Sequence, residues 1–275
     1  MTPAAARPFL KWAGGKRRLL EQFRPHFPAR FRGYIEPVLG SAAVFFHLAS
    51  SRRPGRTILA DSNEELILAY LAVRDRVEAV IDALAVQQRL HGKTHYYEVR
   101  SLRPEELAPA ERAARLIYLN RTCFNGLYRV NSRGEFNVPI GSYVHPRILD
   151  SDNLRRVSRT LQRVELRHEP FFRLPDYCRR GEFIYFDPPY QPISPTSSFT
   201  AYTPGAFKRS DQERLAGTFA ALDRIGCRLM LSNSDSPLIR KLYGSYRIHS
   251  VRARRVINSR GDRRGPVREL LIRNY

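Results

Sequence analysis

The residues best suited to chemistry are Asp187-Pro188-Pro189-Tyr190, which directly follow the apolar run 183–186. A short run of aromatic and branched side chains predicts a central strand of a parallel sheet, covered on both faces. The prolines end ladder pairing and fix the backbone beyond the strand. Because ligands of open α/β sheets bind at the carboxyl ends of strands, this segment should present an acid, rigid carbonyl groups and an aromatic ring to a bound molecule. The alternative is a strand followed by a merely rigid turn.

The tetrapeptide resembles the motif of the amino-group methyltransferases that act on adenine or cytosine in DNA. The resemblance implies the methylation of an exocyclic amine, and the chemistry of that reaction explains these residues. The N6 amine of adenine is a weak nucleophile because its lone pair is conjugated with the ring. The Asp187 carboxylate and the Pro188 carbonyl can accept its hydrogens and turn the lone pair toward an electrophilic methyl group. Tyr190 can stack on the base, which must first leave the duplex.

The block from Phe9 to Lys16 (Phe-Leu-Lys-Trp-Ala-Gly-Gly-Lys) joins an apolar pair to a glycine turn and a predicted helix. It is not a phosphate loop, because position 10 is leucine rather than glycine and position 17 is arginine rather than serine or threonine. On its own it would indicate only a helix entry. However, the block resembles the opening of the Dam-type DNA adenine methyltransferases. This resemblance implies that Trp12 and Lys16 contact S-adenosylmethionine and that Lys11 faces DNA.

A strand–glycine–helix unit follows at residues 33–48, an arrangement that directs backbone N–H groups toward a ligand. The Dam-type pattern here is Glu-Pro-Phe-x-Gly-x-Gly. Glu36 and Gly40 match it, and the resemblance implies that both lie at the cofactor. Val38 replaces the phenylalanine and Ala42 replaces the second glycine. We expect Ala42 to narrow the space through which the cofactor approaches.

Asp61 ends the next predicted strand, residues 57–61. A carboxylate at this place reaches ribose hydroxyls in dinucleotide folds, and the family resemblance implies that it binds the cofactor. Ser62 and Glu65 predict a capping box at the start of the following helix. Both interpretations can hold together, because the cap belongs to Ser62.

Residues 64–147 have a different character. Two predicted helices, at about 63–85 and 111–119, lead into a segment in which Asn-Gly and Arg-Gly predict a β-hairpin. Its residues alone would favour a solvated polar hairpin, but the segment resembles the target-recognition hairpin of Dam-type enzymes. The resemblance implies that Phe124 and Asn125 fill the vacated base position, while Leu127 and Arg129 read bases. Further hairpin residues expected to contact DNA are Asn131, Arg133 and Asn137.

The C-terminal part contains predicted strands at 163–169, 229–235, 246–251 and 269–272. Between the last two, residues 252–264 are rich in arginine. We expect Arg254 and Arg255 to contact DNA phosphates.

The composition also favours a polyanion as partner, since the 275 residues carry a formal net charge of +21 and the pI is near 10.6. The three cysteines have no metal-ligand spacing, which fits a reducing cytosol. We find neither an apolar run of membrane-spanning length nor a secretory pattern. The expected location is therefore the cytoplasm, at a bacterial nucleoid or as a phage-encoded enzyme.

Taken together, the sequence predicts an α/β fold with a Rossmann-like, seven-stranded, mostly parallel methyltransferase sheet and an inserted helical/β-hairpin target-recognition domain. The expected division is 1–63 and 148–275 for the catalytic domain and 64–147 for the insert. The expected reaction transfers a methyl from S-adenosylmethionine to N6 of a flipped adenine in duplex DNA, at GATC or a related site. No metal is implied, because the sulfonium carries its own leaving group.

Three questions stay open at this point. Cytosine-N4 methylation uses related motifs, and a DNA-binding protein that has lost catalysis is the alternative outside enzymes. We expect a monomer, either acting alone or accompanied by a cognate restriction endonuclease.

Overall fold

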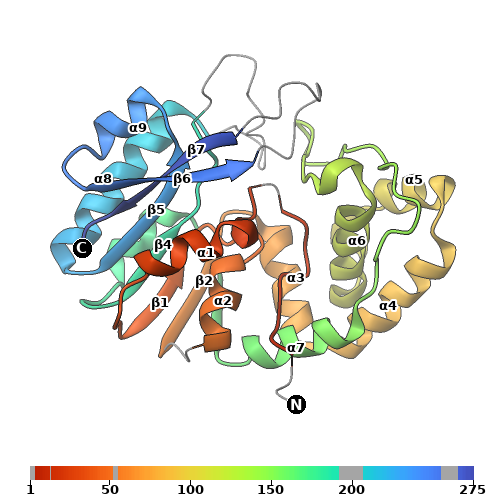
Figure 1. Cartoon of the computed structure of the whole chain (residues 1–275). Helices are drawn as coiled ribbons and strands as arrows, with labels where there is room; N and C mark the ends of the chain where they lie inside the picture. Colours follow the sequence, from red (N-terminus) through yellow and green to blue (C-terminus); the bar gives the residue numbers. More distant parts are fainter. Residues whose placement is uncertain (1–3, 13, 52–54, 192–206, 255–265) are drawn as a thin grey trace.

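Seven strands of the chain form one sheet, in the order β3-β2-β1-β4-β5-β7-β6 (Figure 1). The computed structural model describes residues 4–12, 14–51, 55–191, 207–254 and 266–275. Strands β1 to β5 run parallel, and β7 is antiparallel to both of its neighbours. The predicted seven-stranded, mostly parallel sheet is confirmed. The strands are β1 (Gly33–Glu36), β2 (Arg56–Asp61), β3 (Val164–His168), β4 (Phe183–Phe186), β5 (Arg228–Ser234), β6 (Arg247–Arg254) and β7 (Pro266–Arg273).

Strand β4 lies at the centre of the sheet and is covered on both faces, as predicted. Phe183 and Tyr185 belong to one hydrophobic cluster, whereas Ile184 and Phe186 belong to the other. All four side chains are fully buried. Because successive side chains of a strand point to opposite faces, a continuous apolar run needs helices on both sides of the sheet.

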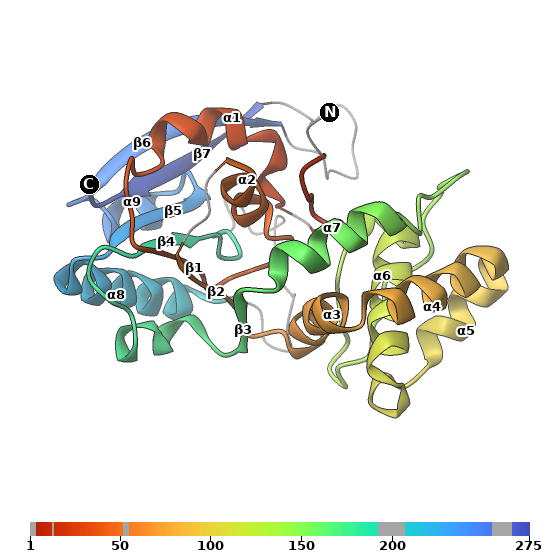
Figure 2. The ribbon, with the colours of Figure 1, turned by 90° about the horizontal axis from the view of Figure 1, so that it is seen from below.

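Helices supply these two layers. Helices α1 and α2 cover one face, and α8 covers the other (Figure 2). Phe45 of α2 stacks against Tyr34, and Phe219 of α8 packs against Phe186 on the opposite face. The helices are α1 (Leu20–Phe23), α2 (Ala43–Ser51), α3 (Glu64–Asp75), α4 (Val77–Leu90), α5 (Lys93–Ser101), α6 (Pro109–Thr122), α7 (Ser151–Leu161), α8 (Arg209–Ile225) and α9 (Pro237–Leu242). None of these described helices is long and apolar enough to span a membrane.

Short 3₁₀ helices occupy several of the connections. One of them, at Lys16–Arg18, follows a turn in which Gly14 adopts a φ of 80°, a left-handed conformation that favours glycine. The others are Arg24–His26, Pro104–Glu106, Phe124–Gly126 and Phe171–Asp176.

Helices α4, α5 and α6 lie to one side of the sheet, with α3 between them and the strands (Figures 1 and 2). One hydrophobic cluster extends from Tyr34 and Phe183 in the sheet to Leu84 and Tyr118 in these helices. The inserted helices therefore share the core of the sheet domain. Helix α5 was not predicted, because its polar sequence buries only two side chains, Tyr96 and Val99.

The predicted cap at Ser62 is wrong. Asn63 is the N-cap of α3, and its side chain accepts a hydrogen bond from the backbone N–H of Leu66 at 3.1 Å. The Asp61 carboxylate accepts the N–H of Asn63 at 2.9 Å, so the chain turns at Asn63 and the helix begins one residue later than expected.

The predicted hairpin is present, but its ladder is interrupted. Among the described residues it contains isolated antiparallel bridges between Cys123 and Ile140 and between Val130 and Phe136. The turn at its tip closes where Gly134 adopts a φ of 80°. Backbone hydrogen bonds still join the two arms, from the N–H of Asn137 to the Arg129 carbonyl at 3.0 Å and from the N–H of Phe124 to the Pro139 carbonyl at 2.9 Å.

Candidate active site

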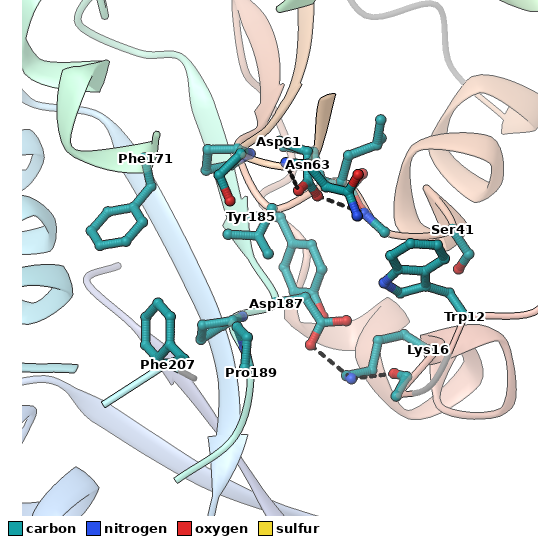
Figure 3. A pocket seen from close by; sticks show the side chains of 18 of the residues that line it. Trp12, Lys16, Ser41, Asp61, Asn63, Phe171, Tyr185, Asp187, Pro189 and Phe207 are labelled. Carbon is teal, nitrogen blue, oxygen red and sulfur yellow. Dashed lines mark hydrogen bonds and ion pairs between the residues drawn. The ribbon is translucent and has the colours of Figure 1, made fainter. Parts of the chain in front are cut away.

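A cavity of about 330 Å³ opens at the carboxyl ends of β1, β2 and β4 (Figure 3). Strands β1 and β4 are neighbours at the centre of the sheet, and the strand order reverses between them. Ligands of open α/β sheets bind at such a switch point, and the volume suits a small molecule. Trp12 lies on one wall, and Phe171 and Phe207 lie on the opposite wall.

Asp187 projects into this cavity from the end of β4. Its Oδ1 atom lies 2.7 Å from the ammonium of Lys16 and accepts a hydrogen bond from the Ser232 hydroxyl at 3.0 Å. Ser232 is in turn hydrogen-bonded to the Tyr185 hydroxyl at 2.9 Å. Burial raises the pKa of Asp187, while the Lys16 ammonium and the Ser232 hydroxyl oppose this rise. The partners therefore favour the ionised carboxylate, which is the form that accepts hydrogen bonds.

Tyr190 lies on the other side of the same ammonium. Its ring centroid is 4.7 Å from Lys16 Nζ, within the range of a cation–π contact. Its hydroxyl donates a hydrogen bond to Glu269 Oε2 at 2.6 Å. Lys16 is buried and also donates to the backbone carbonyl of Gly14, so its position between the carboxylate and the ring is fixed.

Neighbouring elements hold the backbone of the motif. The carbonyl of Pro189 accepts a hydrogen bond from the Gln212 side chain of α8 at 2.9 Å. The N–H of Gln191 donates to the Asn233 side chain of β5 at 3.2 Å, and Asn233 also donates to Gln212. Together with the fixed φ of the two prolines, these contacts make the segment rigid.

Asp61 organises the turn after β1. Its Oδ2 accepts the N–H of Gly40 at 3.2 Å, and burial raises its pKa to about 6. Gly40 has a φ of 49°, and a Cβ atom there would lie only 2.8 Å from Trp12 Cδ1. The close approach of Trp12 to the turn therefore requires glycine at this position.

Glu36 lines the floor of the cavity and is buried. Its Oε2 accepts hydrogen bonds from the Tyr34 hydroxyl at 2.8 Å and from the N–H of Phe45 at 3.1 Å. Burial raises the pKa of Glu36 to about 8. At neutral pH the side chain is therefore mainly protonated and can also donate a hydrogen bond.

The expectation that Ala42 narrows the cofactor space is wrong. Ala42 is fully buried in the hydrophobic core behind the turn, whereas its neighbours Ser41 and Ala43 line the cavity. The cost of the alanine falls on the backbone instead, because its φ is 54°, a left-handed value that side chains disfavour. Val38, the other departure from the pattern, does line the cavity.

Trp12 connects the cavity to the hairpin. Its ring stacks on Tyr128 with the centroids 5.4 Å apart and the planes at 23°. Tyr128 also makes an edge-to-face contact with Phe136 on the opposite arm of the hairpin, with the ring centroids 5.7 Å apart. The aromatic wall of the cavity therefore rests on the inserted segment.

Lys11, the neighbour of Trp12, is bound to the insert through its backbone. Its N–H donates to Asn120 Oδ1 at 2.7 Å, and Asn120 Nδ2 donates back to its carbonyl at 2.5 Å. The Lys11 ammonium donates to the Arg121 carbonyl at 3.1 Å and lies 3.8 Å from the centroid of the Tyr143 ring. Gly126 packs so closely that an added Cβ would lie 2.6 Å from Lys11 Cβ.

Among the residues expected to contact DNA, Phe124 and Asn125 are exposed on the hairpin, and Leu127 is half-buried. Arg129 is exposed, and its guanidinium donates to the Asn137 side chain at 2.7 Å. These residues lie outside the lining of the cavity.

The remaining expected contacts are distributed differently. Asn131 is engaged in the hairpin turn, where its side chain donates to Glu135 and accepts the N–H of Arg133. The side chain of Arg133 is exposed. Arg254 ends strand β6, and Arg255 lies outside the described residues.

Sequence reasoning missed several residues at the site, and their signals were weak. Glu269 begins the predicted strand 269–272 and has no motif nearby. Ser232 lies in the predicted strand 229–235, which resembles a further motif of the family, but no role was assigned to its side chain. Asn120 and Tyr128 looked like parts of the hairpin segment alone. Their contacts to the site join residues far apart in the chain.

Comparisons with known proteins identify the family of the chain. Residues 12–257 match the family of D12 class N6 adenine-specific DNA methyltransferases. The chain is 40% identical to the type II methyltransferase M1.LlaDCHI of Lactococcus lactis subsp. cremoris, over 98% of this chain and 95% of the relative. It is 41% identical to the type II methyltransferase M.MjaIII of Methanocaldococcus jannaschii, over 98% and 99%. Identity to the DNA adenine methylase of Escherichia coli K12 is 36%, over 96% and 94%.

Proposed function

The chain belongs to the D12 class N6 adenine-specific DNA methyltransferases, and we propose that adenine is methylated in the cavity at the carboxyl ends of β1, β2 and β4. The observation that carries this assignment is the position of Asp187. Asp187 follows the carboxyl end of β4 and lines the cavity at the switch point of the sheet. Its carboxylate forms an ion pair with the buried Lys16.

We propose that S-adenosylmethionine binds in this cavity and supplies the electrophilic methyl group. The lining fits such a molecule, because it combines an aromatic wall with buried carboxyl groups that accept hydrogen bonds from ribose hydroxyls. Trp12 packs against the adenine ring of the cofactor, and Asp61 accepts a hydrogen bond from a hydroxyl of its ribose. The residues assigned to the cofactor are Trp12, Lys16, Glu36, Gly40, Asp61 and Asp187.

In the proposed mechanism the protein acts by positioning and electrostatics. The Asp187 carboxylate and the Pro188 carbonyl accept the two hydrogens of the target amine, which turns the nitrogen lone pair out of conjugation. The carboxylate also stabilises the positive charge that develops on the nitrogen, and the methylated nitrogen then loses one proton to Asp187 or to water. Pro189 keeps the carbonyl rigid, and Tyr190 stacks on the flipped base. Lys16 keeps Asp187 ionised.

We propose that residues 64–147 form the target-recognition unit and that the site is GATC or a sequence sharing its core. Phe124 and Asn125 occupy the vacated base position, while Lys11, Leu127 and Arg129 read bases. The remaining residues assigned to DNA are Asn131, Arg133, Asn137, Arg254 and Arg255. The formal charge of +21 supports extensive phosphate contact.

We further propose that the enzyme is a monomer that acts on DNA in the cytoplasm. Two of the relatives are named as type II methyltransferases and a third as a DNA adenine methylase. Both a partnership with a cognate restriction endonuclease and independent action are compatible with these names. Genes beside the coding sequence would distinguish them.

The site assignment is tested by Asp187→Ala in an assay that transfers labelled methyl groups to plasmid DNA. We expect at least a hundredfold loss of turnover, with folding and the affinity for DNA changed little. Asp176→Ala, which removes an exposed acid of a 3₁₀ helix, serves as the matched control. Near-normal turnover of Asp187→Ala would place the reaction elsewhere.

A further inference from the structure

Glu269 is an acid in a strand whose following residues are fully buried and apolar. It lies in β7, opposite Ser234 of β5, and is followed by Leu270, Leu271 and Ile272. An ionisable group at such a place costs desolvation energy unless a partner compensates for it. Burial does raise the pKa of Glu269, and the Lys16 ammonium and the Tyr190 hydroxyl oppose the rise.

The compensating partner belongs to the motif. The Tyr190 hydroxyl donates to Glu269 Oε2 at 2.6 Å, a short distance that is typical of a hydrogen bond to a charged acceptor. The bond connects strand β7 to the segment that follows β4. It fixes the far end of the tyrosine, so that the ring can no longer swing about its Cα–Cβ bond without losing the contact.

The ring of Tyr190 also contacts Lys16, the partner of Asp187. Lys16 Nζ lies 4.7 Å from the ring centroid and 2.7 Å from Asp187 Oδ1. Glu269 is therefore the outer member of a chain of contacts that runs through Tyr190 and Lys16 to Asp187. Tyr190 contacts both the ammonium of Lys16, through its ring, and the carboxylate of Glu269, through its hydroxyl.

We propose that Glu269 is a positioning residue for methyl transfer, which acts by holding the Tyr190 ring in the plane on which the flipped adenine stacks. This inference rests on the proposed function of the cavity. Glu269 does not touch the base; its effect passes through the tyrosine. A leucine at this place would need no hydrogen-bond partner, so the presence of an acceptor is explained by the ring that it orients.

The test compares Glu269→Ala, Glu269→Gln, Tyr190→Phe and the double variant Glu269→Ala/Tyr190→Phe. We expect Glu269→Ala to lower kcat by about tenfold or more, because small misplacements of a positioning group are costly, while KM for S-adenosylmethionine stays unchanged. Glu269→Gln keeps a carbonyl acceptor and should restore most of the rate. Tyr190→Phe should match Glu269→Ala, and the double variant should be no slower, since both changes break one interaction.

A second readout follows the base itself. A duplex with 2-aminopurine in place of the target adenine emits more strongly when the base leaves the stack, and stacking on Tyr190 quenches part of that emission. With a displaced ring, Glu269→Ala should give brighter emission than the unmodified enzyme. Glu78→Ala, which removes an exposed acid of α4, is the control.

The outcomes are separable. If the unmodified enzyme fails to methylate adenine, the proposed function itself is wrong. If it methylates adenine but Tyr190→Phe keeps full turnover, or if the losses of Glu269→Ala and Tyr190→Phe multiply in the double variant, the role of Glu269 is refuted. Should Glu269→Ala fail to fold, Tyr190→Phe still decides the question.

Discussion

The ammonium of Lys16 lies 2.7 Å from Asp187 Oδ1, and this ion pair joins the N-terminal block to the end of the central strand. Lys16 is almost fully buried, whereas Asp187 is partly accessible from the cavity. An isolated buried carboxyl group would tend to bind a proton and lose its value as an acceptor. The ion pair therefore makes the acceptor function of Asp187 depend on the correct folding of the N-terminal segment that carries Lys16.

The pH dependence of kcat should change when the ion pair between Lys16 and Asp187 is removed. Burial raises the pKa of Asp187 and Lys16 lowers it, so Lys16→Met should raise that pKa further. Because the ionised carboxylate is the active form, the acid limb of kcat should move to higher pH in the variant. The measurement is kcat against pH at saturating S-adenosylmethionine and DNA. Lys241→Met, at an exposed position of α9, should keep the original limb, and an unmoved limb in Lys16→Met would contradict the account.

Glu36 should make stability depend on pH. Its pKa is raised by burial from 4.5 to about 8, so the folded state holds a proton that the unfolded state has lost in this range. The free energy of unfolding should therefore fall as the pH rises from about 5 to 8. Glu36→Gln keeps an acceptor for Tyr34 and Phe45 and should flatten this dependence.

Denaturant titrations of the cofactor-free enzyme between pH 5.5 and 8.5 would measure the slope. The control is Glu21→Gln, which neutralises an exposed acid of α1. Equal slopes in Glu36→Gln and in the unmodified protein would show that Glu36 does not carry the effect.

The cofactor assignment is tested by Trp12→Ala and Asp61→Asn. Each removes a stacking surface or a hydrogen-bond acceptor of the cavity, and each should weaken binding of S-adenosylmethionine by roughly 1–3 kcal/mol. Calorimetry gives the affinities, with Asp75→Asn at the end of α3 as a control. Unchanged affinity in both variants would mean that the cofactor binds elsewhere.

Sequence readout is tested on the hairpin. The Arg129 guanidinium is exposed and oriented by Asn137, so it is suited to a bidentate contact with guanine, worth about 1–3 kcal/mol. Arg129→Ala should relax specificity at one base pair. Arg254→Ala should instead weaken binding to all DNA and reduce the salt dependence. DNA treated by the unmodified enzyme should resist a nuclease that cuts only unmethylated GATC, and full cutting despite incorporated label would exclude that site.

Much of the arrangement could be predicted because it is local in sequence. Asp61 and Asp187 each end an apolar run, and parallel strands bring their carboxyl ends to one edge of the sheet. The seven strands and the glycine that ends α8, Gly226 with a φ of 88°, follow from similarly local patterns. The family resemblance added the residues that local chemistry leaves ambiguous, such as Trp12 and Arg129.

The remaining features depend on contacts between distant residues. The bond from Tyr190 to Glu269 and the clamp of Asn120 on Lys11 join positions 79 and 109 residues apart. Glu269 and Asn120 have ordinary roles when read alone, as a strand residue and as part of a helix. The cap of α3 was misplaced for a related reason, since the Asp61 carboxylate, and not the serine pattern, decides where the chain turns.

The central claim, methylation of adenine N6, is tested most directly by digesting enzyme-treated duplex DNA to nucleosides and identifying the methylated product by mass spectrometry. The predicted result is N6-methyldeoxyadenosine from the unmodified enzyme and none above background from Asp187→Asn. N4-methyldeoxycytidine as the product, or equal amounts of N6-methyldeoxyadenosine from both proteins, would contradict it.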